Sequence, residues 1–175
     1  ILNKGTDKET QAETKAFIPR VGLVVEVSEN INLYSTCVKG FQPQGANIQS
    51  APERYGGPFD YVKSELHEIG LKTEWFNKRL NATISVFKIK QENSLEQSAK
   101  TGKPDWRVPV DEESNGFEVD VAGRIAPNWS VVANYAYTDA RIVKLKEDGI
   151  LKDLNMQRPS TPRHAANFWT KYIIQ

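Results

Sequence analysis

The feature of this sequence that most constrains its fold is a strict alternation of apolar and charged side chains. Phe117, Val119 and Val121 alternate with Glu118 and Asp120. A helix would scatter these side chains around its circumference, whereas a strand places the apolar ones on one face and the charged ones on the other. The pattern therefore predicts a β-strand with one apolar face and one polar face.

The same period of two recurs along most of the chain, and it predicts an all-β fold. We expect an antiparallel up-and-down meander, with Val131, Ala133 and Tyr135 on the same face as Val121, and Asn134 on the opposite face. The seven predicted strands are Arg20–Val27, Ile31–Phe41, Leu66–Trp75, Leu80–Lys88, Gly116–Ile125, Trp129–Thr138 and His164–Ile173.

The connections between these strands alternate between short and long. Outer-membrane barrels combine short periplasmic turns with longer extracellular loops, whereas most connections in compact soluble domains are about 4–6 residues long. The alternation therefore predicts a section of a transmembrane β-barrel. The predicted short turns are Ser28–Asn30, Asn77–Arg79 and Pro127–Asn128, and the predicted long loops are Gln42–Tyr61, Gln91–Glu113 and Ala140–Pro162.

The composition is compatible with such a barrel and argues against other classes of protein. The 175 residues carry 23 basic and 22 acidic side chains, so the basic excess of a general nucleic-acid binder is missing. A membrane-spanning helix would need about 20 consecutive apolar residues, and the sequence has no such run. A spanning strand needs only about 9–11 residues, of which every second one is apolar.

Four stretches of the chain resemble the TonB-dependent siderophore receptors, especially the ferrichrome-type branch. They follow the family's order and spacing from about Phe17 onward. The stretches are IPRVGLVVEVSENINLYSTCVKGFQPQ, ELHEIGLKTEWFNKRLNATISVFKIKQENS, NGFEVDVAGRIAPNWSVVANYAYTDARI and TPRHAANFWTKY.

The resemblance implies that residues 1–175 are the C-terminal part of a barrel of about 22 strands in the outer membrane of a Gram-negative bacterium. It implies binding of a ferric siderophore from outside, with iron held by its chelator and not by a protein cofactor. Energy would come from the TonB complex, through an N-terminal plug region that this sequence does not contain. Both ends lie within strand-like or polar sequence, so we expect a fragment of a longer chain.

Candidate ligand-binding residues are the aromatic and cationic side chains of the predicted long loops. Tyr55, Tyr61, Trp106 and Arg107 lie where a ligand arriving from outside would meet the protein. Aromatic faces and a guanidinium suit siderophores, which mix apolar and polar groups. We expect these four residues to contact the ligand.

The sequence predicts neither an enzyme nor a metal site. Glu118 and Asp120 could form a glycosidase acid–base pair, but Arg124 and the row of Glu68, Lys72 and Glu74 offer them partners, which favours charges that line a polar barrel interior. One cysteine and two histidines give no motif with the spacing of metal ligands.

Two alternatives remain open at this stage. The same barrel could import haem, cobalamin or a glycan, because loops and plug determine the cargo. The chain could instead be a soluble β-rich ligand-binding or carbohydrate-active domain, which would bury its apolar face in a core and not expose it to lipid.

Overall fold

The computed structural model describes residues 16–98, 102, 104–147 and 150–174 of the chain. Its strands form one antiparallel sheet in the order β1-β2-β3-β4-β5-β6-β7, and β8 pairs with β6. Two short helices, α1 (Ala46–Ser50) and α2 (Pro52–Tyr55), follow β2. The strands are β1 (Arg20–Ser28), β2 (Ile31–Gln42), β3 (Val62–Trp75), β4 (Leu80–Gln97), β5 (Arg107–Ala126), β6 (Trp129–Glu147), β7 (Ile150–Gln157) and β8 (His164–Tyr172).

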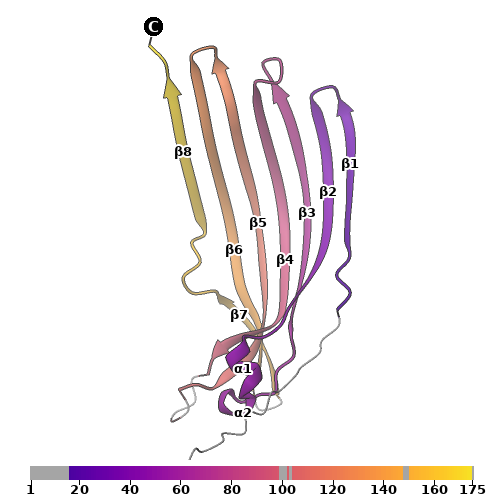
Figure 1. Ribbon diagram of the computed structural model, residues 1–175, viewed down its shortest axis with the longest axis vertical. Coiled ribbons are helices and arrows are strands. Elements are labelled where there is room, and N and C mark those ends of the chain that lie inside the picture. Colours follow the sequence, from indigo (N-terminus) through magenta and orange to yellow (C-terminus); the bar gives the residue numbers. More distant parts are fainter. Residues whose placement is uncertain (1–15, 99–101, 103, 148–149, 175) are drawn as a thin grey trace, which may run out of the picture.

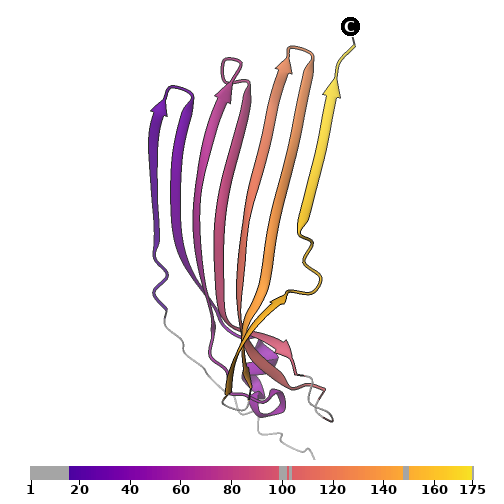
Figure 2. The same ribbon diagram turned by 180° about the vertical axis from the view of Figure 1, so that it is seen from behind.

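The sheet is a single curved layer with different connections at its two ends. The turns between β1 and β2, β3 and β4, and β5 and β6 lie at one end, together with the C-terminus of the chain (Figure 1). The helices and the longer connections gather at the opposite end, which the view from behind also shows (Figure 2). The described sheet is open, because β1 lies at one edge and β7 and β8 at the other. The predicted antiparallel meander is confirmed, and the predicted short turns lie together at one end of the sheet.

The strand register separates the side chains into two faces. Phe117 pairs with Tyr137, Val119 with Tyr135 and Val121 with Ala133, and directly paired residues of adjacent strands point to the same side. Glu118, Asp120 and Asn134 occupy the opposite side, so the predicted division is confirmed. The apolar face comprises, among others, Leu23, Leu33, Ile69, Leu71, Ile84, Val86, Phe117, Val119, Val121, Val131, Ala133, Tyr135, Tyr137, Ala166 and Phe168; the polar face comprises Glu68, Lys72, Thr83, Ser85, Glu118, Asp120, Asn134 and Asn167.

Two rows of aromatic side chains bound the apolar face. Trp129 pairs with Tyr172 next to the short turns. At the other end, the Phe117 ring lies 5.7 Å from that of Tyr135 and 5.9 Å from that of Tyr137, measured between ring centroids. We call this second row, formed by Phe117, Tyr135 and Tyr137 on the side of the long connections, the upper belt. Beyond it, the same face carries charged pairs: Lys88 with Glu113 at 2.8 Å, Arg141 with Asp139 at 2.8 Å and Arg163 with Asp139 at 3.6 Å.

Two of the predicted long loops are wrong, because most of their described residues form strands. β4 continues to Gln97, and β5 already begins at Arg107. β6 continues to Glu147 and is followed by β7, so the sheet has eight strands and not seven. The third predicted loop, Gln42–Tyr61, contains α1 and α2. Register shifts between Gln91 and Ser94 on β4 interrupt the alternation that the sequence prediction relied on.

Two shorter strands pair with successive parts of β6. β8 pairs with residues 129–137 of β6, and β7 pairs with residues 141–147. Residues 158–163 connect these two partners (Figures 1 and 2). Neither described helix is long and apolar enough to cross a bilayer.

Candidate functional site

The end of the sheet that carries the long connections has its own small hydrophobic core. We call the described residues of 43–61, 91–113 and 140–162 the rim region. Val108, Val110, Ala140 and Ile142 are buried there, and Val110 is only 1% exposed. Apolar residues such as Ile84 and Val86 on the exposed part of the sheet are far more open, at 51% and 52%, although Val131 near the short turns is only 7% exposed. The rim region is therefore a packed structure and not a set of free loops.

A buried carboxylate lies next to this core. Glu112 is 7% exposed and forms an ion pair with Arg158, which also lies 3.5 Å from Glu96. An uncompensated buried charge would cost several kcal/mol, so Arg158 neutralises a group that the core would otherwise exclude. This contact ties the end of β7 to β4 and β5.

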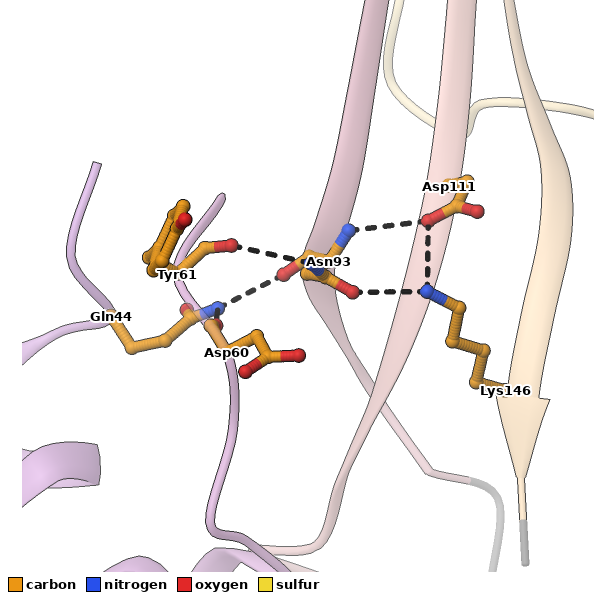
Figure 3. Close-up of polar contacts among 6 residues, drawn as sticks. All are labelled: Gln44, Asp60, Tyr61, Asn93, Asp111 and Lys146. Carbon is orange, nitrogen blue, oxygen red and sulfur yellow. Dashed lines mark hydrogen bonds and ion pairs between the residues drawn. The ribbon is translucent and has the colours of Figure 1, made fainter. Parts of the chain in front are cut away.

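Asn93 connects the helical segment, residues 44–61 with α1 and α2, to the sheet (Figure 3). Its backbone adopts a left-handed conformation, with φ of 62°, which asparagine tolerates better than most residues. Gln44 donates hydrogen bonds from Nε2 to the carbonyl oxygens of Asn93 and Asp60, at 2.9 and 2.8 Å. Asn93 in turn donates from Nδ2 to the carbonyl of Tyr61 at 3.3 Å. Both ends of the helical segment are thus attached to the same residue of β4.

The same asparagine also contacts β5 and β6. Its backbone N–H donates to Oδ1 of Asp111 at 3.2 Å, and its Oδ1 accepts from Nζ of Lys146 at 3.0 Å. Lys146 lies 3.6 Å from Asp111 (Figure 3). Asn93 is 9% exposed, so it is a nearly buried polar group with partners on every side, as its burial requires.

A second contact joins α2 to the segment before β5. Arg54 donates to Oδ2 of Asp105 through Nε at 2.9 Å and Nη2 at 2.7 Å, and this carboxylate raises the pKa of Arg54. Gly56 has φ of 88°, and a Cβ atom there would collide with the indole of Trp106. Glycine is therefore required at this position, both for its backbone conformation and for the indole that lies against it.

These contacts place three of the four predicted ligand-binding residues at one corner. Tyr55 is the last residue of α2, where its ring lies 5.7 Å from the guanidinium of Arg54. Trp106 lies against Gly56, and Arg107 follows it directly. Tyr61 has a different aromatic partner, with its ring 4.4 Å from that of Phe41.

The expectation that all four lie in free loops is partly wrong. Tyr55 belongs to a helix, and Arg107 is the first residue of β5, paired with Gln97. Nη1 of Arg107 is buried and has no hydrogen-bond partner among the described residues. All four side chains are half-buried, so each still exposes part of its surface at the rim region.

The sequence analysis missed the residues that organise the rim region. Asn93, Gln44 and Lys146 come from three separate segments, and only the strand register brings them together. One local signal was present, because Val108 and Val110 lie two residues apart between Arg107 and Asp111, as in a strand with one apolar face.

Chemically, the rim region offers aromatic surface beside cations. The guanidinium of Arg54 lies 5.7 Å from the Tyr55 ring, and Nζ of Lys63 lies 5.3 Å from the Tyr61 ring, an arrangement that suits a ligand with both apolar and anionic groups. The polar face of the sheet adds Glu118 and Asp120, which line a shallow hollow of about 210 Å³ with Asn134.

The strand order, the alternating connections and the two faces all agree with one known family. Residues 3–175 match the family described as TonB dependent receptor-like, beta-barrel. The chain belongs to this family. Its members are transport receptors of the outer membrane and not enzymes, and the receptor fold accounts for the open, curved meander described above.

Individual receptors resemble the chain over most of its length. A ferric-pyoverdine receptor from a Pseudomonas species is 25% identical over 173 residues, which is 98% of this chain and 20% of that receptor. A catecholate siderophore receptor from Escherichia coli is 30% identical over 164 residues, 87% of this chain and 20% of the receptor. The crystal structure of the ferripyoverdine receptor of Pseudomonas aeruginosa superimposes with a TM-score of 0.73 at 23% identity, covering 93% of this chain and 21% of that one.

The chain thus spans about a fifth of the length of the receptors it matches.

Proposed function

We propose that a receptor containing this chain takes up a ferric siderophore across the outer membrane of a Gram-negative bacterium. The observation that carries the proposal is the family match over residues 3–175, together with relatives whose names state ferric-pyoverdine and catecholate siderophores as their ligands. The iron remains in its chelator, so the protein needs no cofactor of its own and breaks no bond.

The proposed location in the membrane is supported by the apolar face. Tyr137 lies eight positions after Trp129 along β6, which corresponds to about 26 Å of strand at about 3.3 Å per residue, or about 20 Å along the membrane normal at a strand tilt of about 40°. The apolar band of outer-membrane barrels is about 25 Å tall and is flanked by aromatic girdles. The charged pairs that begin beyond the upper belt suit the polar side of the membrane interface.

In this proposal the rim region faces the outside of the cell and meets the siderophore first. Tyr55, Trp106 and Arg107 provide one contact corner, and Tyr61 provides a second contact near Phe41. Aromatic faces would pack on the apolar parts of the chelate, and Arg107 would bind its anionic oxygens. Energy for release into the periplasm would come from the TonB complex, acting on parts of the receptor outside this chain.

Growth tests the cargo directly. A strain that lacks the receptor should fail to grow on one ferric siderophore as the sole iron source, and the restored receptor should rescue it. Rescue should disappear in a strain without TonB. If growth on haem, on a glycan or in the presence of cobalamin depends on the receptor instead, the same barrel carries a different cargo. A purified receptor that converts its ligand would contradict transport.

Replacement of Trp106 by alanine tests the proposed contact corner. Loss of one stacked ring should weaken siderophore binding by about 1–2 kcal/mol. The purified receptor is titrated with the ferric siderophore, and binding is followed through the absorbance of the siderophore itself, which does not depend on tryptophan. Trp75→Ala is the matched control, because Trp75 is 55% exposed at the short-turn end. Equal losses in both variants would remove Trp106 from the binding surface.

A further inference from the structure

Cys37, Glu65 and His67 form a cluster on the apolar-face side of the sheet, just beyond the upper belt. Cys37 on β2 pairs directly with His67 on β3, and Glu65 lies two residues before His67 on the same strand. Paired residues and residues two apart on a strand share one side of a sheet. The three side chains therefore converge, although 28 residues separate Cys37 from Glu65 in the sequence.

The position of the cluster along the strands follows from the register. His67 pairs with Lys88, which pairs with Asn115. Asn115 lies two residues before Phe117 of the upper belt on β5. The cluster is thus one step beyond the belt, where charged side chains replace apolar ones, and it is on the opposite side of the sheet from Glu118 and Asp120.

The geometry of the cluster is close to that of a metal site. One ligand atom from each residue lies within 4.8 Å of the other two, and Nε2 of His67 is 3.1 Å from Oε1 of Glu65. Ligand atoms around a tetrahedral Zn²⁺ are about 3.3–3.6 Å apart, given bond lengths of about 2.0–2.3 Å. The side chains of His67 and Glu65 are 55% and 37% exposed, so small rotations of both could close the site around an ion.

The donor set selects the kind of ion. A thiolate, an imidazole and a carboxylate are ligands of Zn²⁺ and related transition ions, whereas Mg²⁺ and Ca²⁺ prefer oxygen ligands only. Three protein ligands leave a fourth position for water. The neighbouring cations oppose binding, because Lys39 and Lys90 pair in register with Glu65. A strong metal–thiolate bond is therefore needed to hold the ion.

We propose that Cys37, Glu65 and His67 bind one Zn²⁺ ion on the outside of the barrel, at the extracellular boundary of its apolar band. The ion links β2 to β3 and is distinct from any iron that passes through the interior. The ligand set does not depend on which cargo the receptor carries, because none of its three residues lies on the polar face.

Cobalt substitution tests the site in the intact receptor. Metal-free receptor in detergent micelles is titrated with Co²⁺, whose tetrahedral d–d bands and thiolate-to-cobalt charge-transfer band report the ligands. We expect one equivalent to bind with a charge-transfer band, and Zn²⁺ to displace it. Cys37→Ser should abolish that band, and Glu65→Gln and His67→Gln should each weaken Zn²⁺ binding at least about tenfold, as even the loss of partners outside the ligand set does.

His164→Gln is the matched control, because His164 is the only other histidine of the chain and its Nδ1 lies 2.8 Å from the Tyr135 hydroxyl. This variant should bind Zn²⁺ as the unaltered receptor does. The proposal is overturned if the unaltered receptor shows no charge-transfer band, if Cys37→Ser retains it, or if His164→Gln lowers Zn²⁺ affinity as much as His67→Gln.

Alkylation of Cys37 gives a second readout that does not depend on cobalt. Zn²⁺ should slow the reaction of Cys37 with iodoacetamide at least about tenfold in the folded receptor, because a metal-bound thiolate is a poorer nucleophile and is covered by its ligands. Protection should be lost in His67→Gln, with heat-resistant electrophoretic migration showing that this variant is folded. An equal alkylation rate with and without Zn²⁺ would contradict the site.

Discussion

The two halves of β4, β5 and β6 are continuous strands in different surroundings. On the side of the short turns, the strands expose apolar residues such as Val86, 52% exposed, on a single layer. In the rim region the same strands bury Val108 and Val110 and attach a helical segment through Asn93. One half therefore needs an apolar exterior that the chain does not provide, whereas the other half makes a core of its own. A single continuous strand can therefore pass through two different environments.

The largest expected effect comes from a charge in the first half. Val121→Arg, in a receptor containing this chain, should destabilise the membrane-inserted state by about 2–4 kcal/mol, because it exposes a guanidinium to lipid near the middle of the band. Urea-dependent unfolding from bilayers measures the loss. Asp120→Asn, one residue away on the polar face, should change stability little. Equal effects of the two changes would contradict the assignment of the two faces.

A smaller effect is expected from the residue that holds the rim region together. Asn93→Ala removes the side-chain hydrogen bonds to Tyr61 and Lys146 and places alanine in a left-handed conformation, at a cost of about 1–3 kcal/mol. The change should speed amide hydrogen exchange in residues 44–61 and leave the strands near the short turns protected.

Asn115→Ala serves as the control for this measurement, because Asn115 is exposed and lies on β5 nearer the upper belt. Its exchange pattern should match that of the unaltered receptor. Uniformly faster exchange over all strands in Asn93→Ala would contradict the division into two halves.

The smallest effect should follow Arg54→Gln. The ion pair with Asp105 is exposed, with side chains 64% and 46% accessible, and such pairs contribute little because water and salt screen them. We expect no measurable change in the unfolding midpoint, and a local increase in exchange confined to α2. A clear drop in midpoint would show that this contact, and not Asn93, holds the helical segment to the sheet.

The sequence predicted the half with exposed faces better than the half with a core. Period-two alternation located β1 to β6 and β8 near the short turns, because each side chain there faces one of two uniform environments. In the rim region a bulge after Gln91 shifts the alternation, and Glu112 is buried through its ion pair with Arg158. The composition of residues 91–113 and 140–162 made both stretches look like loops.

The candidate sites were predictable to different degrees. Tyr55, Tyr61, Trp106 and Arg107 could be selected because they are aromatic or cationic residues between strands, and their role in binding stays a prediction. The cluster of Cys37, Glu65 and His67 could not be found without the β2–β3 register, since no local spacing connects residue 37 to residue 65. Long-range pairing carries that information.

Because β6 pairs with two separate strands, β7 and β8, the receptor should tolerate added sequence in the connection between them. Residues 159–162 lie between two anchored positions, since the backbone N–H of Arg158 donates to Ala140 and that of Thr138 donates to the carbonyl of Arg163, both at 2.9 Å. A peptide inserted at exposed Ser160 would lengthen only the connection between the anchors, and each doubling of a flexible connection costs about 0.6 kcal/mol. In the proposed orientation, the connection between β7 and β8 is a suitable position for an epitope displayed on the cell surface.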